Sequence, residues 1–262
     1  MTDTLPDLIP IHTRAAQVHV LAPGAWRMEI PAGPAGHYRL AQVDDYHRLR
    51  RRDFPWRSPL RLSLRARASA PDLPGTWGFG LWNDPFSLSM GLGGAAQRFP
   101  ALPNAAWFFF ASPPNYLSFR DDLPAQGFLA ATFQAPAIPA PLQAPLLALA
   151  APGLVLAALP AGARLVRRLL RRLVRQSAAL VPGDVTAWHT YTLDWQPDGV
   201  TFMLDGDTIA AASVAPRGPL ALVLWIDNQY AALPPTGRLR YGTLANPGPA
   251  WLEVSDLNID HE

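Results

Sequence analysis

Hydrophobic and polar residues alternate along much of the chain, as in "LRLSLRARAS" at 60–69. Leu or Ala occupies every second position there, and Arg or Ser fills the positions between. A period of two with one polar face predicts a strand half exposed to water, as in an antiparallel sheet. Similar runs predict further strands at 25–30, 37–43, 76–82, 105–111, 115–119, 127–134, 188–196, 200–204, 208–214, 219–227, 237–241 and 250–260.

Turn residues separate these runs at short intervals. "PDG" at 197–199 and "DG" at 205–206 lie between apolar runs, which predicts consecutive hairpins. About a dozen short strands in one chain favour an all-β fold with two packed antiparallel sheets. We therefore expect one domain over 1–262, with its sheets built from 17–134 and 186–260.

The segment between these two blocks, 136–182, reads as a helical insertion. It contains "APLLALAAPGLVLAALPAGA" at 144–163, a 20-residue apolar stretch whose three prolines argue against one straight membrane-spanning helix. "ARLVRRLLRRLVRQSAALV" at 163–181 then predicts a strongly amphipathic helix. Its expected apolar face is Leu165, Val166, Leu169, Leu170, Leu173, Val174, Ser177 and Leu180, and its expected polar face is Arg164, Arg167, Arg168, Arg171, Arg172 and Arg175.

Charge changes this picture only locally. All 22 basic residues are Arg, and the net charge is only +2. Because six arginines gather at 164–175, the rest of the chain is mildly acidic, and a nucleic-acid-binding protein is disfavoured. Cysteine is absent and the six histidines lack ligand spacing, so we expect neither a metal site nor a cofactor.

The first residues, "MTDTLPDLIPIHTRAA", lack the basic start and continuous apolar stretch of a secretory signal. We therefore expect a cytoplasmic protein. Peripheral attachment to a membrane through 144–181 is the alternative that the amphipathic pattern leaves open.

Several motifs occur in an order that resembles a known family. "TWGFGLWND" is followed far downstream by "WHTYTLDWQPDGVTFMLDGD", then "PLALVLWIDNQ" and a closing "WLEVSDLNID". Together they resemble the concanavalin A-like jelly roll, and within it the family 16 glycoside hydrolases of the laminarinase and lichenase type. The resemblance covers roughly 76–119 and 188–260. It implies a jelly-roll sandwich whose concave sheet carries a carbohydrate groove.

The catalytic pattern of that family is missing where the resemblance would place it. The family carries Glu-x-Asp-x-x-Glu on one strand, and retaining hydrolysis needs two carboxyls about 5–5.5 Å apart. The corresponding stretch here, "NAAWFFFASPPNYLSF" at 104–119, has no carboxylate, and the chain has only Glu29, Glu253 and Glu262. We therefore assign no catalytic residue and expect the chain not to be an enzyme. Asp227, which ends an apolar strand, is the acid that a divergent hydrolase would use.

The aromatic residues on these segments suggest a binding groove instead. Aromatic rings stack on the apolar faces of sugars and equally on apolar molecules. We expect a non-catalytic module that binds a carbohydrate or an apolar small molecule; a divergent family 16 hydrolase acting on a polysaccharide is the alternative. The candidate ligand-binding residues are Trp82, Asn83, Trp107, Phe109, Tyr116, Trp225, Asp227, Asn228 and Tyr230.

The arginine-rich helix has two readings of its own. It lies on an anionic membrane surface, or it packs its leucines on the sandwich or on a second subunit. The sequence leaves the oligomeric state and the ligand open. The candidate membrane-contact residues are Arg164, Arg167, Arg168, Arg171, Arg172, Arg175, Leu165, Leu169 and Leu173.

Overall fold

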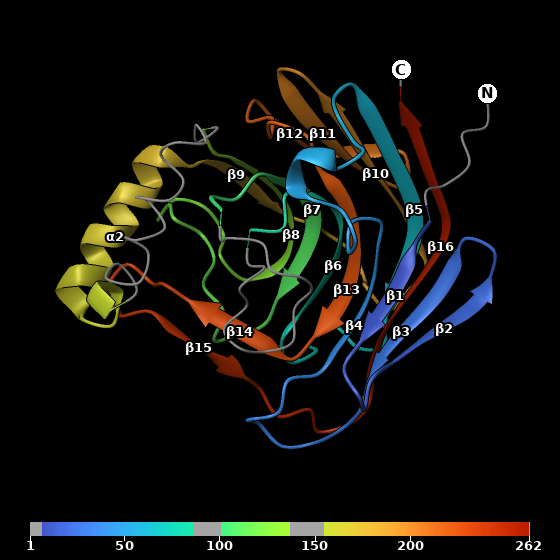
Figure 1. Ribbon diagram of the computed structural model, residues 1–262, viewed down its shortest axis with the longest axis horizontal. Coiled ribbons are helices and arrows are strands. Elements are labelled where there is room, and N and C mark those ends of the chain that lie inside the picture. Colours follow the sequence, from blue (N-terminus) through green and yellow to red (C-terminus); the bar gives the residue numbers. More distant parts are fainter. Residues whose placement is uncertain (1–6, 86–100, 137–154, 262) are drawn as a thin grey trace.

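The protein folds as two large antiparallel sheets packed face to face (Figure 1). The computed structural model describes residues 7–85, 101–136 and 155–261. Each large sheet has seven strands, and a two-stranded sheet lies beside them. The all-β sandwich expected from the alternating pattern is confirmed.

The first sheet, named here the β7 sheet, has neighbouring strands that are far apart in the sequence. Strand β13 lies between β4 and β6, so residues from both halves of the chain meet there. In spatial order its strands are β1 (Ile9–His12), β4 (Leu40–Asp44), β13 (Ala221–Asp227), β6 (Thr76–Trp82), β7 (Ala105–Ala111), β8 (Gly127–Gln134) and β9 (Arg175–Leu180).

The second sheet, named here the β5 sheet, shows the predicted alternation. Burial along β5 (Leu60–Ala68) alternates without a break, with Leu and Ala inside and Arg and Ser outside. In spatial order the strands are β12 (Asp207–Ala212), β11 (Gly199–Leu204), β10 (His189–Gln196), β5, β16 (Ala250–His261), β3 (Ala25–Ile30) and β2 (Gln17–Ala22). The small sheet pairs β14 (Gln229–Ala232) with β15 (Arg240–Thr243), and a 3₁₀ turn, η1, spans Arg51–Asp53.

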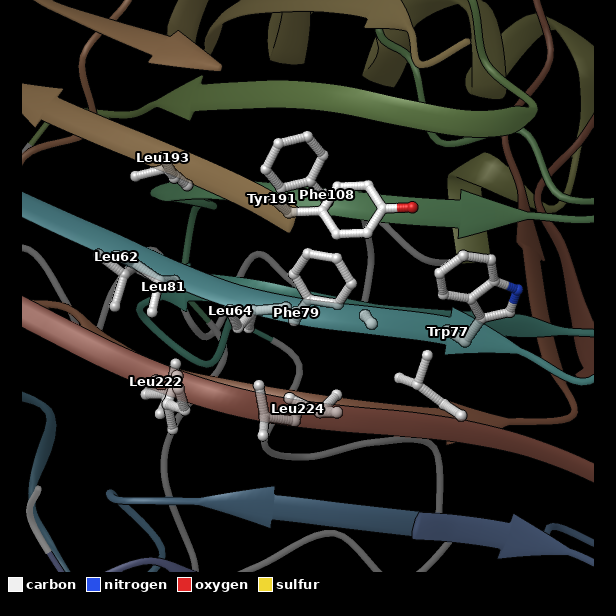
Figure 2. Close-up of a cluster of buried hydrophobic side chains, with 14 of the residues drawn as sticks. Leu62, Leu64, Trp77, Phe79, Leu81, Phe108, Tyr191, Leu193, Leu222 and Leu224 are labelled. Carbon is white, nitrogen blue, oxygen red and sulfur yellow. The ribbon is translucent and has the colours of Figure 1, made fainter. Parts of the chain in front are cut away.

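The core lies between the two large sheets (Figure 2). Leucines of β5 meet aromatic rings of β6 and β7, and the Phe79 and Phe108 ring centroids are 5.5 Å apart. Tyr191 from β10 lies 5.0 Å from the Phe79 ring and 5.1 Å from the Phe108 ring. Burial of this much apolar surface is the main favourable term in folding, and it fixes the β7 sheet against its partner.

One predicted strand is wrong. Residues 115–119 form no strand; Tyr116 makes only an isolated bridge to Ala232. The side chains of this segment bond to nearby backbone instead, since Asn115 Nδ2 donates to Ser112 O and Ser118 Oγ donates to Arg120 O. Such local bonds offer the backbone an alternative to sheet pairing.

The amphipathic helix is shorter than predicted. Helix α2 spans Pro160–Leu173, and the end of the expected helix forms strand β9. The six residues of β9 pair with β8, so the backbone bonds available at this sheet edge override the helical pattern. The predicted insertion at 136–182 thus contains α2 and contributes one edge strand to the β7 sheet.

Most of the apolar stretch predicted at 144–163 lies outside the described residues, which resume at Val155. None of the described helices has the length and apolarity that crossing a membrane requires.

Candidate functional site

The β7 sheet has a second face, turned away from the core, and this face is aromatic. Along β7, Phe108 enters the core between the sheets, whereas Trp107 and Phe109 point the other way. Strand alternation places Trp82 and Trp225 from β6 and β13 beside them. We call the face that carries these four rings and Phe133 of β8 the aromatic face.

The rings of the aromatic face stack on one another. Trp82 lies nearly parallel to Trp225, with centroids 6.3 Å apart and an interplanar angle of 5°. Trp107 stacks on Phe109 at 5.2 Å, and Phe109 stacks on Trp225 at 5.7 Å. Offset stacking at such separations is favourable and holds the rings in fixed orientations. The expectation that Trp82, Trp107, Phe109 and Trp225 gather on one face therefore agrees with the geometry.

Glycines of β6 make room for these rings. A Cβ atom at Gly78 would lie 2.9 Å from Cη2 of Trp225 and 2.3 Å from the carbonyl oxygen of Phe108. Only a residue without a side chain allows the indole to lie so close to the sheet. The sequence "TWGFGLW" thus encodes a core face with Trp77 and Phe79 and a flat opposite face for ring stacking.

We predict that Gly78→Ala lowers the free energy of unfolding by about 1–3 kcal/mol, because the added methyl forces backbone and indole apart. The shift of Trp225 should also change the tryptophan fluorescence of the folded state. Gly248→Ala is the matched control, since a Cβ there meets nothing within 4 Å. Urea denaturation of both variants measures the difference, and equal midpoints would contradict the tight packing over Gly78.

Two indole N–H groups of the aromatic face have no hydrogen-bond partner among the described residues. They belong to Trp82 and Trp107. The third indole is satisfied, since Trp225 Nε1 donates to Thr76 Oγ1 at 3.0 Å. Trp107 is only 6% exposed, and a buried donor without an acceptor is costly. The nitrogen atoms of both groups are buried, as are the indole nitrogens of Trp77 and Trp195 in the core, which also have no partner among the described residues.

Asp227 ends β13 at the border of the same face. Its Oδ1 accepts from Thr76 Oγ1 at 2.8 Å and from the backbone N–H of Gln229 at 3.1 Å. Its Oδ2 accepts from the Tyr38 hydroxyl at 3.4 Å. Burial raises the pKa of Asp227 to about 7, and these hydrogen bonds offset part of that rise. The carboxyl is thus partly protonated near neutral pH.

Asp44 is the other carboxyl in the strands of the β7 sheet. It lies opposite Val223, four residues from Asp227 along β13. At a rise of ~3.3 Å per residue this places the two carboxyls about 13 Å apart along the strand. Retaining and inverting hydrolysis use separations of about 5–5.5 Å and 6.5–9.5 Å, so this pair fits neither.

Strand β7, which resembles the catalytic strand, supplies no carboxylate to this face. The residues of β7 on the aromatic face are Ala105, Trp107, Phe109 and Ala111, all apolar. The two internal segments outside the description, 86–100 and 137–154, contain no Asp or Glu in their sequence. No cluster of metal-binding side chains occurs in the described ranges either.

Four further candidate ligand-binding residues lie away from the rings. Asn83 and Asn228 are bonded to backbone: Asn83 Nδ2 donates to Leu102 O at 2.9 Å, and Asn228 Nδ2 donates to Leu244 O at 2.7 Å. Tyr116 lies under the guanidinium of Arg167, 5.2 Å from it, and Tyr230 belongs to the small sheet. The structure thus places Asn83, Asn228, Tyr116 and Tyr230 in loop and edge contacts.

The residues that sequence reasoning missed are Tyr38, Gln42 and Thr76. Tyr38 and Thr76 bond to Asp227, and Gln42 donates to Asp44 Oδ2 at 2.7 Å. Tyr38 and Gln42 come from β4 and the residues just before it, and Thr76 comes from β6. Only the pairing of β4 and β6 with β13 brings the two segments together. The alternation of β4 and β6 was the signal that could have placed Gln42 and Thr76 on this face.

Comparison with solved structures finds similar folds among glycoside hydrolases. A glycoside hydrolase family protein from Mycobacterium thermorestibile superposes with a TM-score of 0.50 and 12% identity, covering 97% of this chain and 94% of that one. A family 16 endo-glucanase from Bacteroides ovatus gives 0.47 and 9% identity over 99% and 97% of the two chains. No protein-family model and no curated protein matches the chain. The jelly-roll fold expected from the motif order is therefore confirmed, as a fold.

Proposed function

We propose that the aromatic face of the β7 sheet recognises a carbohydrate. The observation that carries this proposal is the pair of buried indole N–H groups, on Trp82 and Trp107, which lie within a stack of rings and have no partner in the part of the chain that the structure describes. Sugars present apolar C–H faces that stack on rings and hydroxyl oxygens that accept from indole N–H groups. A purely apolar ligand would satisfy the rings and leave both donors unpaired.

A ligand reaches this face at its rim. Trp107 and Trp225 are 6% and 7% exposed, whereas Tyr38, Gln42 and Trp82 are partly exposed. These three supply a hydroxyl, an amide and an indole, which are the polar groups that orient sugars in binding sites. Binding therefore starts at Trp82 and involves the inner rings through the Trp82–Trp107 contact at 5.9 Å.

Binding without hydrolysis is the reading that the carboxyl geometry supports. The strand that resembles the catalytic one carries only apolar residues on this face, and Asp227 and Asp44 are too far apart to act together. Asp44 accepts hydrogen bonds from groups of the protein itself, namely Gln42 Nε2 and the backbone N–H groups of Tyr46 and His47.

A divergent glycoside hydrolase is the second candidate. The fold comparison favours it, because the similar structures are described as glycoside hydrolases. The raised pKa of Asp227 also favours it, since a general acid must hold its proton near neutral pH. On this reading Asp227 donates a proton to the departing sugar oxygen, and an unidentified base activates water.

We predict that the chain binds at least one of laminarin, lichenan, agarose or carrageenan in affinity electrophoresis. Trp107→Phe keeps a ring and removes the N–H donor, so it should weaken binding about 2–10-fold, the worth of one hydrogen bond. Trp251→Phe is the control, because Trp251 lies on the β5 sheet beneath Arg27. Equal losses in both variants, or no binding to any of the four, would contradict carbohydrate recognition by this face.

A reducing-end assay on the same four polysaccharides separates the two candidates. Binding without hydrolysis predicts no release above a heat-killed control. Release that is abolished by Asp227→Asn would replace the binding module with the hydrolase.

A further inference from the structure

Helix α2 leaves part of its apolar face in solvent. Figure 1 shows it at one side of the sandwich, beside β14 and β15. Packing of the leucines on the sandwich, one of the two readings of the pattern, would leave the arginines outside, but Arg167 is buried at 6% exposure. Its Nη1 donates to Leu233 O at 2.8 Å and to Ser118 O, and its Nη2 pairs with Asp121 at 2.6 Å. Arg167 is thus excluded from the predicted membrane contacts.

The contacts of Arg167 fix which side of α2 faces the protein. The buried residues of α2 are Gly162, Ala163 and Arg167, and the next stripe around the helix is exposed. That stripe, Leu165, Leu169 and Leu173, has exposures of 43%, 48% and 49% and forms a row at i, i+4 and i+8. We call it the leucine row. Val155 and Leu159, just before the helix, are 72% and 61% exposed.

Three arginines of α2 have no ion-pair partner among the described residues. Arg164, Arg168 and Arg172 form a second row that adjoins the leucine row. Among the described residues no carboxylate forms an ion pair with any of these three. A cleft of about 170 Å³ lies beside the helix, and its lining includes four arginines and only one carboxylate. The lining residues are Phe119, Asp121, Arg164, Arg167, Arg168, Arg171 and Pro235.

The neighbouring leucine and arginine rows of α2 restrict which kind of partner can bind this helix. Arginines four residues apart repel one another on a helix, so the free protein carries a cost that an anionic partner relieves. A second copy is disfavoured, because paired leucine rows would bring two uncompensated arginine rows together. A bilayer interface offers acyl chains to leucine and phosphates to arginine at neighbouring depths.

We propose that α2 binds an anionic phospholipid surface. The leucine row enters the boundary between head groups and acyl chains, and the arginines at 164, 168 and 172 contact lipid phosphates. The cleft beside the helix holds one phosphate among its guanidinium groups, as arginine forks do. Helix α2 lies in the plane of the interface and does not cross it. This proposal is independent of carbohydrate recognition by the aromatic face.

Co-sedimentation of the full chain with vesicles tests the proposal. We expect binding to phosphatidylcholine vesicles that contain phosphatidylserine, and little binding to phosphatidylcholine alone. High salt should weaken it, because exposed charges are screened within about 8 Å at physiological ionic strength. Arg168→Glu with Arg172→Glu should weaken binding about tenfold or more, since each arginine near an anionic surface contributes. Leu169→Ser with Leu173→Ser should weaken it similarly, because the apolar contact is lost.

The controls make each result decisive. Arg14→Glu with Arg48→Glu changes the net charge equally at exposed positions outside α2 and should leave vesicle binding intact. Melting temperatures of all variants should stay close to that of the wild type, because every substituted side chain is exposed. Equal sedimentation with neutral vesicles, or equal loss in the control, would overturn the proposal. Glycerol 3-phosphate binding without vesicle binding would indicate a soluble anion site, and retention on polyglutamate without vesicle binding an acidic protein partner.

Discussion

Phe108→Ala is expected to lower the free energy of unfolding by about 3–5 kcal/mol, the usual cost of truncating a buried aromatic core residue. Phe108 is 2% exposed and lies at the centre of the core (Figure 2). Its ring is 5.1 Å from Tyr191 on β10 and 5.2 Å from Phe202 on β11, both in the opposite sheet. The substitution therefore leaves a cavity where the two sheets meet.

Urea unfolding at 25 °C followed by tryptophan fluorescence measures this loss. Tyr241→Ala provides the comparison, since that ring is 53% exposed on β15 and should change stability by less than about 0.5 kcal/mol. A small effect for Phe108→Ala would mean that the sheets do not pack through this ring.

Asp227→Asn is expected to stabilise the protein above pH 7. The folded-state pKa of Asp227 is raised from 3.8 to about 7, so the folded state holds a proton that the unfolded state releases. Its contribution to stability is fully present below about pH 4 and is lost as the pH rises through 7. The rise of the pKa from 3.8 to about 7 corresponds to a free energy on the order of 4 kcal/mol, at 1.36 kcal/mol per pKa unit.

Asparagine fits the partners of Asp227. The amide oxygen can accept from Thr76 Oγ1 and from the N–H of Gln229, and the amide N–H₂ can donate to the Tyr38 hydroxyl. The variant is neutral at every pH and should therefore lose less stability than the wild type between pH 5 and pH 8. Urea titrations at these two pH values give the difference.

Asp45→Asn is the matched comparison. Burial also raises the pKa of Asp45 to about 7, but both of its oxygens accept from N–H donors, Trp56 Nε1 and Leu222 N. An asparagine there must turn its N–H₂ toward one of these donors, so Asp45→Asn should destabilise the protein. If both variants behaved alike, hydrogen-bond geometry would not control stability at these sites. If Asp227→Asn left the pH dependence unchanged, Asp227 would be ionised throughout.

The fold could largely be read from local pattern. Alternation in "LRLSLRARA" and the uniform apolar runs at 105–111 and 127–134 predicted strands that the structure contains at these places. The prediction failed at the short strands β1, β2, β9 and β14, whose backbone pairing depends on a neighbouring strand. Whether such a segment forms a strand depends on the strand it pairs with, and the local hydrophobic period does not encode this partner.

The aromatic face was partly predictable. Trp82, Trp107, Phe109 and Trp225 could be assigned to one face because strand parity is local. The distance between Asp44 and Asp227 could not, because it depends on the register of β13 against β4. That register also brings Tyr38 to Asp227 from 189 residues away in the sequence.

Helix α2 separates the two contributions most clearly. The sequence by itself determined an all-β sandwich, the absence of paired acids on β7, and an amphipathic helix rich in arginine and leucine. Only the tertiary structure decided which side of that helix meets the protein. The carbonyl groups of Ser118 and Leu233 and the carboxylate of Asp121 together bind one guanidinium, and this fixes Arg167 inside. An acceptor set assembled from three separate places exists only after folding, so the helical period alone could not foresee that the leucine row would be left in solvent.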